Sequence, residues 1–446
     1  MLQEMPCSLM KTLKMVPLAA AATLLTILSA ASCNREPEKA GSQVQVVVAL
    51  PKWFYPSEES PWLLKTWEAA RRETLGVDLV AELVPGKTEH ILQKLLVMRA
   101  SGQGPDMACL RLNWMPQLLA RGILKPMDES VPESLWAGLL PSLREAVAQE
   151  GKRYLLPYDI GVRVILYRSD LVEEAGLPAP PLHWSFETLV TYAKSLTVDR
   201  DGDGSIDQWG LGVPAARNEK SYYQWLPWFW TLGGNGLQEG GRAALATPAA
   251  IRAMQWYWDL AHLHRVTPTT LYSMDQEAIF QGLANGLFAM SVGGSWEVSM
   301  LKKFSPYGDK IRIALFPASE EGKASVTLVD GWGFGLLTGE PNKGRAVSRL
   351  LSGLCSAEHQ VEKYRASGVL SPLESVYESP IFQEDPTGRI LFEALRTGRA
   401  PDEATLSPTI VEAVGAAMQE VLMGYAVPEQ ALSEQEKRLL ESAKEG

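Results

Sequence analysis

Apolar and polar residues alternate along the chain with two periods. Short apolar or alternating runs lie at 44–51 (VQVVVALP), 77–85 (VDLVAELVP), 106–112 (DMACLRL) and 153–167. Such runs are typical of strands. Longer stretches with helical spacing follow the first two runs, at 62–75 and 88–101. Strands that alternate with helices predict an α/β fold.

The second half of the chain reads as mainly helical. Ser185 is placed to cap a helix that continues to Leu196. Helical sequence then extends to Leu301, interrupted by Gly233-Gly234 and by GGSW at 293–296. Extended segments return at 311–317 (IRIALFP) and 329–337 (VDGWGFGLL), and the last hundred residues are mainly helical. Pro157 lies inside the 153–167 run, where a proline is not expected in a central ladder.

The N-terminus has the pattern of an export signal. From Met10, two lysines precede an apolar run that ends at Ala30-Ala31-Ser32-Cys33. This ending resembles the lipobox of bacterial lipoproteins, although Ala30 stands where a Leu is usual. We expect residues 1–32 to be a signal peptide, Cys33 to be lipidated and residues 33–43 to form a polar tether. The alternative is an ordinary secreted protein cut near Ser32.

Composition excludes one class of partner. The formal net charge is −10 and no basic cluster occurs, which argues against nucleic acid as a partner. Cys109 and Cys355 lie in apolar contexts, so two buried thiols are favoured over a disulfide. Removal of residues 1–32 from the 446 leaves 414 residues, a length that predicts two domains or more.

Residues 199–210 (DRDGDGSIDQWG) begin like a calcium-binding EF-hand loop. The candidate ligands are Asp199, Asp201, Asp203, Ser205 and Asp207. The twelfth position, where an EF-hand has a bidentate Glu, is Gly210. Two interpretations stay open: a structural calcium site, or Asx-turns that need no metal.

Motifs for catalysis are missing from the sequence. The five histidines form no HExxH pattern, and neither a GxSxG elbow nor a GxxxxGK[ST] phosphate loop occurs. We expect a protein that is not an enzyme and needs no cofactor besides the calcium considered above. The enzymatic alternative is a secreted carbohydrate-active hydrolase with two carboxylates in a Trp-lined cleft.

A series of segments carries a resemblance to a known family. They are ASGQGPDM (100–107), LLARGILKPMDE (118–129), YLLPYDIGVRVILYRSDLVEEAGLPAPPLHWSFETL (154–189), FQGLANGLFAMSVGGSW (280–296), GWGFGLL (331–337) and AMQEVLMGYAVPEQAL (417–432). In this order, the chain resembles the extracellular solute-binding proteins of bacterial ATP-driven (ABC) importers, in the group that includes maltose- and other oligosaccharide-binding proteins.

The resemblance implies a two-lobed periplasmic-binding-protein-like fold of type II, in which each lobe is a sheet flanked by helices. Hinge strands join the lobes, with crossings expected near 158–162, 326–330 and 371–376. The N-terminal lobe would combine 44–158 with 330–371, and the C-terminal lobe 159–329 with 372–446. Ligand would lie between the lobes, which close by hinge bending.

The chain has 14 tryptophans, several of them after strands or beside glycines. An indole ring offers an apolar platform to the C–H face of a sugar. The candidate ligand-binding residues are Trp53, Tyr55, Asn113, Trp114, Asp159, Tyr223, Trp225, Trp296, Asp330 and Trp332, and the family resemblance is what implies a binding aromatic at Trp296 and at Trp332. Trp67, Trp184, Trp256 and Trp258 are expected to lie in the core or on the surface of a lobe.

The resemblance therefore implies a monomeric, lipid-anchored receptor on the extracytoplasmic or periplasmic face of the cell membrane. It would capture a sugar or oligosaccharide and deliver it to a permease with ATPase subunits. A non-transport adhesion lipoprotein is a further alternative.

Overall fold

The computed structural model describes residues 44–73, 77–86, 88–340, 343–403 and 405–445. The expected signal peptide, the tether and Cys33 lie outside the described residues. In the described part of the chain, no helix combines the length and the apolar character that a membrane span requires.

One mixed sheet runs through the described chain, and two short hairpins lie beside it. Its nine strands are β1 (Val44–Pro51), β2 (Val77–Val84), β3 (Met107–Arg111), β6 (Leu155–Arg168), β7 (Trp209–Gly212), β10 (Phe288–Gly294), β11 (Ile311–Ala314), β12 (Thr327–Leu336) and β13 (Gly398–Arg399). The hairpins are β4 (Ala148–Gln149) with β5 (Lys152–Arg153), and β8 (Gln238–Glu239) with β9 (Arg242–Ala243). The main order is β2-β1-β3-β12-β6-β10-β7, with β11 on β6 and β13 on β12.

Strand β6 links two groups of strands because it changes partners along its length. Up to Val162 it pairs with β12, and from Arg163 onward it pairs with β10 and β11. All three partners are antiparallel to β6, whereas β1 is parallel to β2 and β3, and β7 is parallel to β10. The change of partner lies next to the crossing expected at 158–162.

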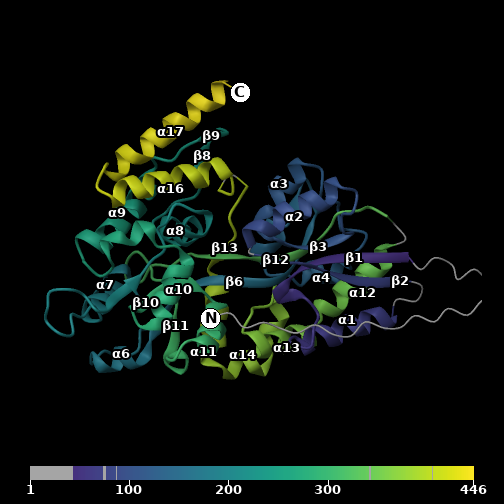
Figure 1. Ribbon diagram of the computed structural model, residues 1–446, viewed down its shortest axis with the longest axis horizontal. Helices are drawn as coiled ribbons and strands as arrows, with labels where there is room; N and C mark the ends of the chain where they lie inside the picture. Colours follow the sequence, from purple (N-terminus) through teal and green to yellow (C-terminus); the bar gives the residue numbers. More distant parts are fainter. Residues whose placement is uncertain (1–43, 74–76, 87, 341–342, 404, 446) are drawn as a thin grey trace, which may run out of the picture. The chain divides into compact units, whose positions relative to one another are not determined.

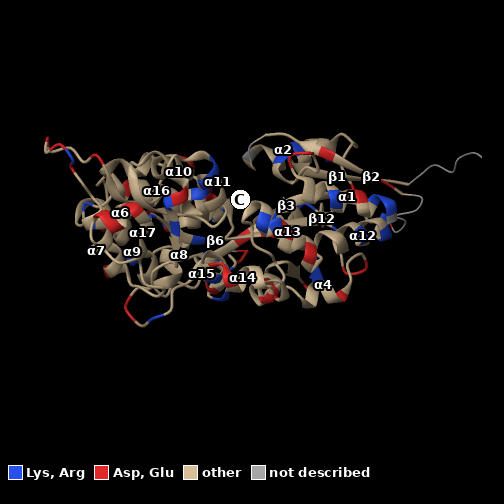
Figure 2. Cartoon of the chain, turned by 90° about the horizontal axis from the view of Figure 1, so that it is seen from below, with Lys and Arg blue, Asp and Glu red and all other residues tan. Residues whose placement is uncertain are grey.

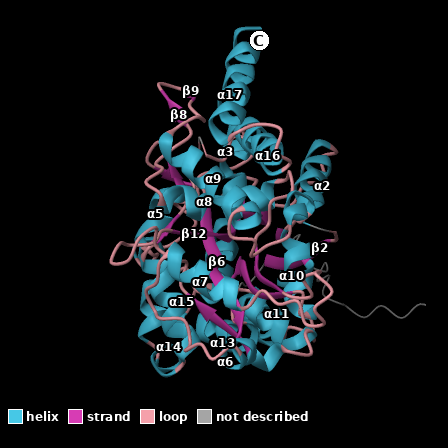
Figure 3. Cartoon of the chain, turned by 90° about the vertical axis from the view of Figure 1, so that its left-hand side faces the viewer, coloured by secondary structure: helices cyan, strands magenta, loops and turns pink. Residues whose placement is uncertain are grey.

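Helices cover the sheet on both sides (Figures 1 and 3). They are α1 (Pro61–Glu73), α2 (Thr88–Ala100), α3 (Met115–Ala120), α4 (Glu133–Ala137), α5 (Pro141–Ala146), α6 (Ser169–Glu174), α7 (Phe186–Ser195), α8 (Glu219–Thr231), α9 (Pro248–His262), α10 (Gln276–Asn285), α11 (Glu297–Phe304), α12 (Gly344–Leu354), α13 (Ala357–Ser367), α14 (Pro380–Glu384), α15 (Pro386–Arg396), α16 (Pro408–Leu422) and α17 (Pro428–Glu445). The 3-10 helices of the described residues are η1 (Lys52–Phe54), η2 (Leu112–Trp114), η3 (Thr269–Ser273), η4 (Gly308–Lys310) and η6 (Glu374–Glu378). The predicted α/β class is confirmed.

Local sequence signals account for several element ends. Ser185 caps α7 as expected, since its Oγ accepts a hydrogen bond from the Thr188 N–H at 3.2 Å. Pro157 lies in β6, but only in the part of the strand that has no ladder to β10 or β11. Its missing N–H therefore costs no hydrogen bond on that side.

Beside Pro157 the β6 strand bulges. Trp332 pairs with Asp159, and Gly333 pairs with Pro157, so Tyr158 is left without a partner in the ladder. A bulge of this kind bends a strand and redirects its side chains. The bulge stands directly at the entrance to the predicted crossing.

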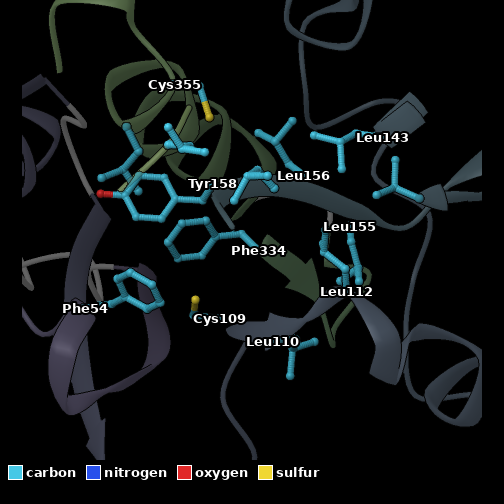
Figure 4. Close-up of a cluster of buried hydrophobic side chains, with 14 of the residues drawn as sticks. Phe54, Cys109, Leu110, Leu112, Leu143, Leu155, Leu156, Tyr158, Phe334 and Cys355 are labelled. Atoms are coloured by element: carbon cyan, nitrogen blue, oxygen red, sulfur yellow. The ribbon is translucent and has the colours of Figure 1, made fainter. Parts of the chain in front are cut away.

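Two hydrophobic clusters fill the space between sheet and helices. The first collects β1, β3, α1, α12 and the start of β6, and it continues along β6 to α10 and α11. In its centre Tyr158 lies between Phe54 and Phe334, at ring distances of 5.6 and 5.3 Å (Figure 4). The second cluster collects α7, α8, α9, α16 and α17 against β7 and β10. Cys109 and Cys355 are buried free thiols, as predicted.

The third crossing, expected as a hinge strand near 371–376, is not an extended strand. The chain there forms two isolated bridges, Ile160–Leu370 and Leu139–Leu373, and then enters η6. Further along the chain, the two-residue strand β13 pairs in parallel with Thr327 and Leu328 of β12. The expected lobe boundaries stay a prediction.

Candidate functional site

Aromatic rings gather where two parallel strands end. η1 follows β1 and η2 follows β3, so both turns lie at the carboxyl edge of this part of the sheet, where ligands bind in open α/β folds. Trp332 of β12 stands between them, edge to face with Trp53 at 5.3 Å and with Trp114 at 5.5 Å. Trp53 is 42% exposed and Trp332 partly exposed, whereas Trp114 is buried. Trp53 and Trp332 thus present indole surface at this edge.

Close to Trp332, whose register partner on β3 is Arg111, lies a buried ionic group of three side chains. Asp330 accepts from Arg111 Nη2 at 2.7 Å and from Arg163 Nη2 at 3.2 Å, both on Oδ2. Burial alone would raise the pKa of Asp330, but the two guanidinium groups outweigh it and lower that pKa. The carboxylate is therefore held ionised, and it joins β3, β6 and β12.

Trp296 covers the same region from the turn between β10 and α11. Its ring packs on two glycine positions: a Cβ at Gly161 would lie 2.5 Å from Cζ3, and one at Gly294 would lie 2.3 Å from Cη2. The Arg163 guanidinium lies 4.8 Å from the centre of a Trp296 ring, a distance typical of a cation–π contact. Two glycines on neighbouring strands thus make room for one indole.

The next residue, Glu297, is buried beside this tryptophan. Burial raises the pKa of Glu297 to about 7, although Gln276 donates a hydrogen bond to its Oε1 at 2.5 Å. The carboxyl group is thus partly protonated near pH 7, which reduces the cost of burying it.

A polar contact connects η2 with α8. The Asn113 amide donates to Glu219 Oε1 at 2.9 Å and to the Tyr223 hydroxyl at 2.8 Å, while that hydroxyl donates to Glu219 at 2.8 Å. The side-chain oxygen of Asn113 is buried without a hydrogen-bond partner. An unpaired buried acceptor is costly unless a ligand or water supplies a donor.

Asp159, on the bulged part of β6, is half-buried and pairs in register with Trp332. Burial raises the pKa of Asp159 to about 6, and the positive charge of Lys363 opposes the shift. Tyr55 is half-buried and packs against the first hydrophobic cluster.

A small pocket adjoins this group. It has a volume of about 220 Å³ and is lined by residues that include Asn113, Asp330, Glu145, Asp402 and Leu406. Asn113 and Asp330 therefore belong both to the pocket wall and to the polar contacts described above.

One candidate residue must be corrected. Trp225 is fully buried and stacks on Phe229 at 5.1 Å inside the second hydrophobic cluster. With no exposed surface, it is a packing residue and not a ligand contact. Tyr223, on the same helix, is also buried but reaches Asn113 through its hydroxyl.

The four tryptophans that were expected in the core or on a lobe surface are found in these environments. Trp67 and Trp184 are buried, and Trp256 and Trp258 lie partly buried against the second cluster.

Sequence reasoning missed Arg111, Arg163, Glu219 and Glu297. Arg163 carried a signal, since it is a charge in the middle of the apolar run 160–167, where a buried cation needs a partner. The partner, Asp330, lies 167 positions away and could not be read from spacing.

The Asp199 loop is exposed and ordered by its own side chains. The Asp199 carboxylate accepts from the N–H groups of Gly202 at 2.8 Å and Gly204 at 2.9 Å. Carboxylate oxygens of Asp199, Asp201 and Asp207 lie within 4.8 Å of one another. These contacts suit both interpretations, Asx-turns and a calcium site.

The structure also explains why this loop lacks the acid of an EF-hand. A Cβ at Gly210 would lie 1.8 Å from the carbonyl oxygen of Ala193 in α7, so no glutamate can stand there.

Known proteins share this architecture. Two solved structures, the maltose-bound T. maritima MalE3 and the cyclic alpha-maltosyl-1,6-maltose binding protein from Arthrobacter globiformis, superpose with TM-scores of 0.72 and 0.75. They are 20% and 21% identical to the chain and cover 89% and 90% of it, and 99% and 100% of their own lengths. At this identity the likeness shows the fold alone, and it confirms the predicted two-lobed binding-protein fold.

Alignments with curated relatives cover less of the chain than the solved structures do. A binding protein of Brucella abortus is 24% identical over 268 residues, 60% of this chain and 62% of that protein. The chain thus spans less than two thirds of that relative's length. The arabinooligosaccharide-binding protein of Halalkalibacterium halodurans is 25% identical over 333 residues, 72% of this chain and 71% of that protein.

A family model matches residues 76–348, more than half of the chain, and its description is bacterial extracellular solute-binding protein. The matched region includes Trp296 and Trp332. It also includes the Arg111–Asp330–Arg163 group and the Asp199 loop. The chain belongs to the bacterial extracellular solute-binding protein family.

Proposed function

We propose that this protein is the substrate-binding component of an ABC importer and that it captures a sugar or oligosaccharide for delivery to a membrane permease. The observation that carries the proposal is the pair of accessible indoles, Trp53 and Trp332, next to the buried Arg111–Asp330–Arg163 group. Apolar ring faces beside fixed polar groups suit a sugar, which has a C–H face and a rim of hydroxyl groups.

Each part of the site has a task in this proposal. Trp53, Trp332 and Trp296 contact the sugar faces, and Asp159 and Asn113 accept hydrogen bonds from hydroxyl groups. The strands β6 and β12 pass between the two groups of helices and act as the hinge. A ligand that touches residues on both sides of the hinge favours the closed state by its extra contacts.

The names of relatives guide the choice of ligand. Among them are an arabinooligosaccharide-binding protein, a maltotriose-binding protein and a mannitol-binding protein. We infer that the ligand of this chain belongs to the same chemical range of neutral, hydroxyl-rich molecules.

The proposal extends to the anchor and to energy supply. Cys33 carries lipid and holds a monomeric receptor at the extracytoplasmic or periplasmic face of the membrane, and ATPase subunits of the transporter supply the energy. The receptor itself catalyses no reaction.

A thermal-shift screen with maltotriose, arabino-oligosaccharides and mannitol tests this function. A sugar at about 100 times its dissociation constant adds about 2.7 kcal/mol to the free energy of unfolding. Stabilisation by one of these sugars, recovered chemically unchanged after incubation, supports the proposal. Hydrolysis of the sugar supports the hydrolase alternative, and a lack of stabilisation by any sugar or polyol contradicts sugar capture.

We propose separately that the Asp199 loop holds a structural calcium ion. Asp199, Asp201 and Asp207 would supply carboxylate oxygens, with Asp203 and Ser205 as further candidates. Close carboxylates repel one another unless a cation lies between them. The ion would brace the loop and take no part in ligand binding.

A further inference from the structure

Lys363 of α13 is a buried lysine with an unusual set of contacts. Its side chain is 1% exposed, and lysine is almost never buried to this extent without partners. The ammonium group donates to the carbonyl oxygens of Tyr158 and Leu370, the latter at 3.1 Å. It also lies 4.5 Å from the centre of the Tyr158 ring.

The carbonyl that Lys363 contacts belongs to the bulged residue of β6. Tyr158 has no register partner on β12, and Lys363 donates to its carbonyl oxygen. The Leu370 carbonyl accepts from the Ile160 N–H at 3.2 Å as well. One lysine therefore ties the bulged part of β6 to the segment that follows α13.

A second contact from the same helix fixes the tyrosine ring. The Tyr158 hydroxyl lies 3.0 Å from Nε2 of His359, whose Nδ1 is hydrogen-bonded to Thr66. Helix α13 thus holds Tyr158 at its carbonyl and at its hydroxyl. The conformation of the bulge is over-determined, as expected of a backbone irregularity that serves a site.

The strand register places the Asp159 side chain on one face of the sheet. Asp159 pairs in register with Trp332, and paired residues project to the same face of a sheet. Asp159 also shares a face with Gly161, two positions on, whose surface is covered by Trp296. The carboxylate therefore lies on the face that carries both tryptophans.

The charged and titratable groups near Asp159 and Lys363 come from several elements. Burial raises the pKa of Asp159, the charge of Lys363 in α13 lowers it, and the charge of Asp330 in β12 raises it. Burial lowers the pKa of Lys363, whereas Asp159, Cys355 after α12 and Cys109 of β3 raise it. Asp159 is the acidic group that stabilises the buried ammonium, and the lysine in turn favours the ionised carboxylate.

We propose that Lys363 is a positioning residue of the binding site: it holds the bulge at Tyr158, aims the Asp159 carboxylate at the ligand and keeps that carboxylate ionised as an acceptor for a ligand hydroxyl. The inference rests on the sugar-binding function proposed above. It assigns to a buried residue an effect, exerted through Asp159, on the pH range in which sugar is bound.

The expected pH dependence follows from the charges. If only the ionised Asp159 accepts the ligand hydroxyl, affinity falls as pH falls through its pKa, which burial raises to about 6. Between pH 7 and pH 5 the wild-type affinity should then drop about tenfold. Loss of the Lys363 charge removes an influence that lowers this pKa, so the midpoint should move to higher pH.

The test is calorimetric affinity from pH 5 to pH 8 for the sugar selected by the screen among maltotriose, arabino-oligosaccharides and mannitol. We expect Asp159→Asn to bind more weakly and with a flat profile across this range, and Lys363→Met to show its midpoint above that of the wild type. In the Asp159→Asn background, Lys363→Met should cause no further change in the profile. Tyr364→Phe, the neighbouring position on α13 whose hydroxyl donates to Asp385, is the matched control and should keep the wild-type midpoint.

Two results would overturn the proposal: a folded Lys363→Met protein with the wild-type midpoint, or an Asp159→Asn protein with the wild-type pH profile. If Lys363→Met does not fold, Lys363→Gln removes the charge and keeps a donor, and the same shift is required of it. Wild-type protein that binds no sugar at any pH contradicts the proposed function instead, so the two failures are distinguishable.

Discussion

Trp296 lies directly on Gly161 of β6, with no room between its ring and the strand for even one methyl group. A Cβ at Gly161 would come within 2.5 Å of the indole, and real Cβ contacts are not that short. The position of this tryptophan therefore depends on a glycine 135 positions earlier in the chain, at the strand that joins the two groups of strands.

The first prediction uses that dependence. Trp296→Ala should weaken sugar binding by roughly thirtyfold or more, since buried aromatic anchors typically cost about 2 kcal/mol when truncated. Gly161→Ala should weaken binding in the same direction because it displaces the ring. Calorimetric affinity and the melting temperature of the ligand-free protein are measured side by side.

Trp225→Ala is the contrasting variant for that experiment. Its ring is fully buried in the second cluster, so its removal should cost roughly 3–5 kcal/mol of stability. If Trp296→Ala instead melts far below the wild type and its folded fraction binds sugar normally, Trp296 is a packing residue and its place in the site is wrong.

The second prediction concerns the buried ionic group. Asp330→Asn leaves two guanidinium groups without their carboxylate, and breaking a buried pair typically costs about 3–5 kcal/mol. Chemical denaturation measures the loss. Glu434→Gln, which breaks an exposed pair with Arg438 on α17, is the control and should change stability by less than about 1 kcal/mol.

The same carboxylate gives a pH dependence of stability. The pKa of Asp330 in the folded protein is lower than the ordinary value of 3.8. Its contribution is therefore complete above about pH 3.8 and is lost as pH falls through the lower folded value. Asp330→Asn should lack this part of the acid destabilisation, and an unchanged acid limb in that variant would argue against the ion pair.

The third prediction tests calcium in the Asp199 loop. If the ion binds, a chelator should lower the melting temperature, while sugar affinity stays nearly constant because the loop is separate from the aromatic site. Asp201→Ala should abolish the response to the chelator. Melting that ignores the chelator in the wild type would leave the Asx-turn interpretation alone.

The fourth prediction concerns Cys33, which lies outside the described residues. If this cysteine is acylated, full-length protein made in a bacterium should partition into detergent, because the acyl chains are apolar. Two or more such chains make the anchoring stable. Cys33→Ser should release or mislocalise the protein. Equal partitioning of the two proteins would rule out the lipid anchor.

Sequence patterns located the parts of the site that depend on neighbours along the chain. Trp53 and Asn113 were identified because they follow strands, and parallel strands place the residues after them at one edge. The cap at Ser185 was equally local. The family resemblance supplied Trp296 and Trp332, whose surrounding segments are distinctive.

The tertiary structure decided which side chains meet and which are covered. Trp225 and Tyr223 lie two positions apart on one helix, yet one is enclosed by the core and the other reaches Asn113. The contacts of Arg163 and Arg111 with Asp330 span 167 and 219 positions, and the contact of Lys363 with Tyr158 spans 205. Hydrophobic periodicity fixes which face of an element is buried, but it contains no term for the partner that a distant strand brings to that face.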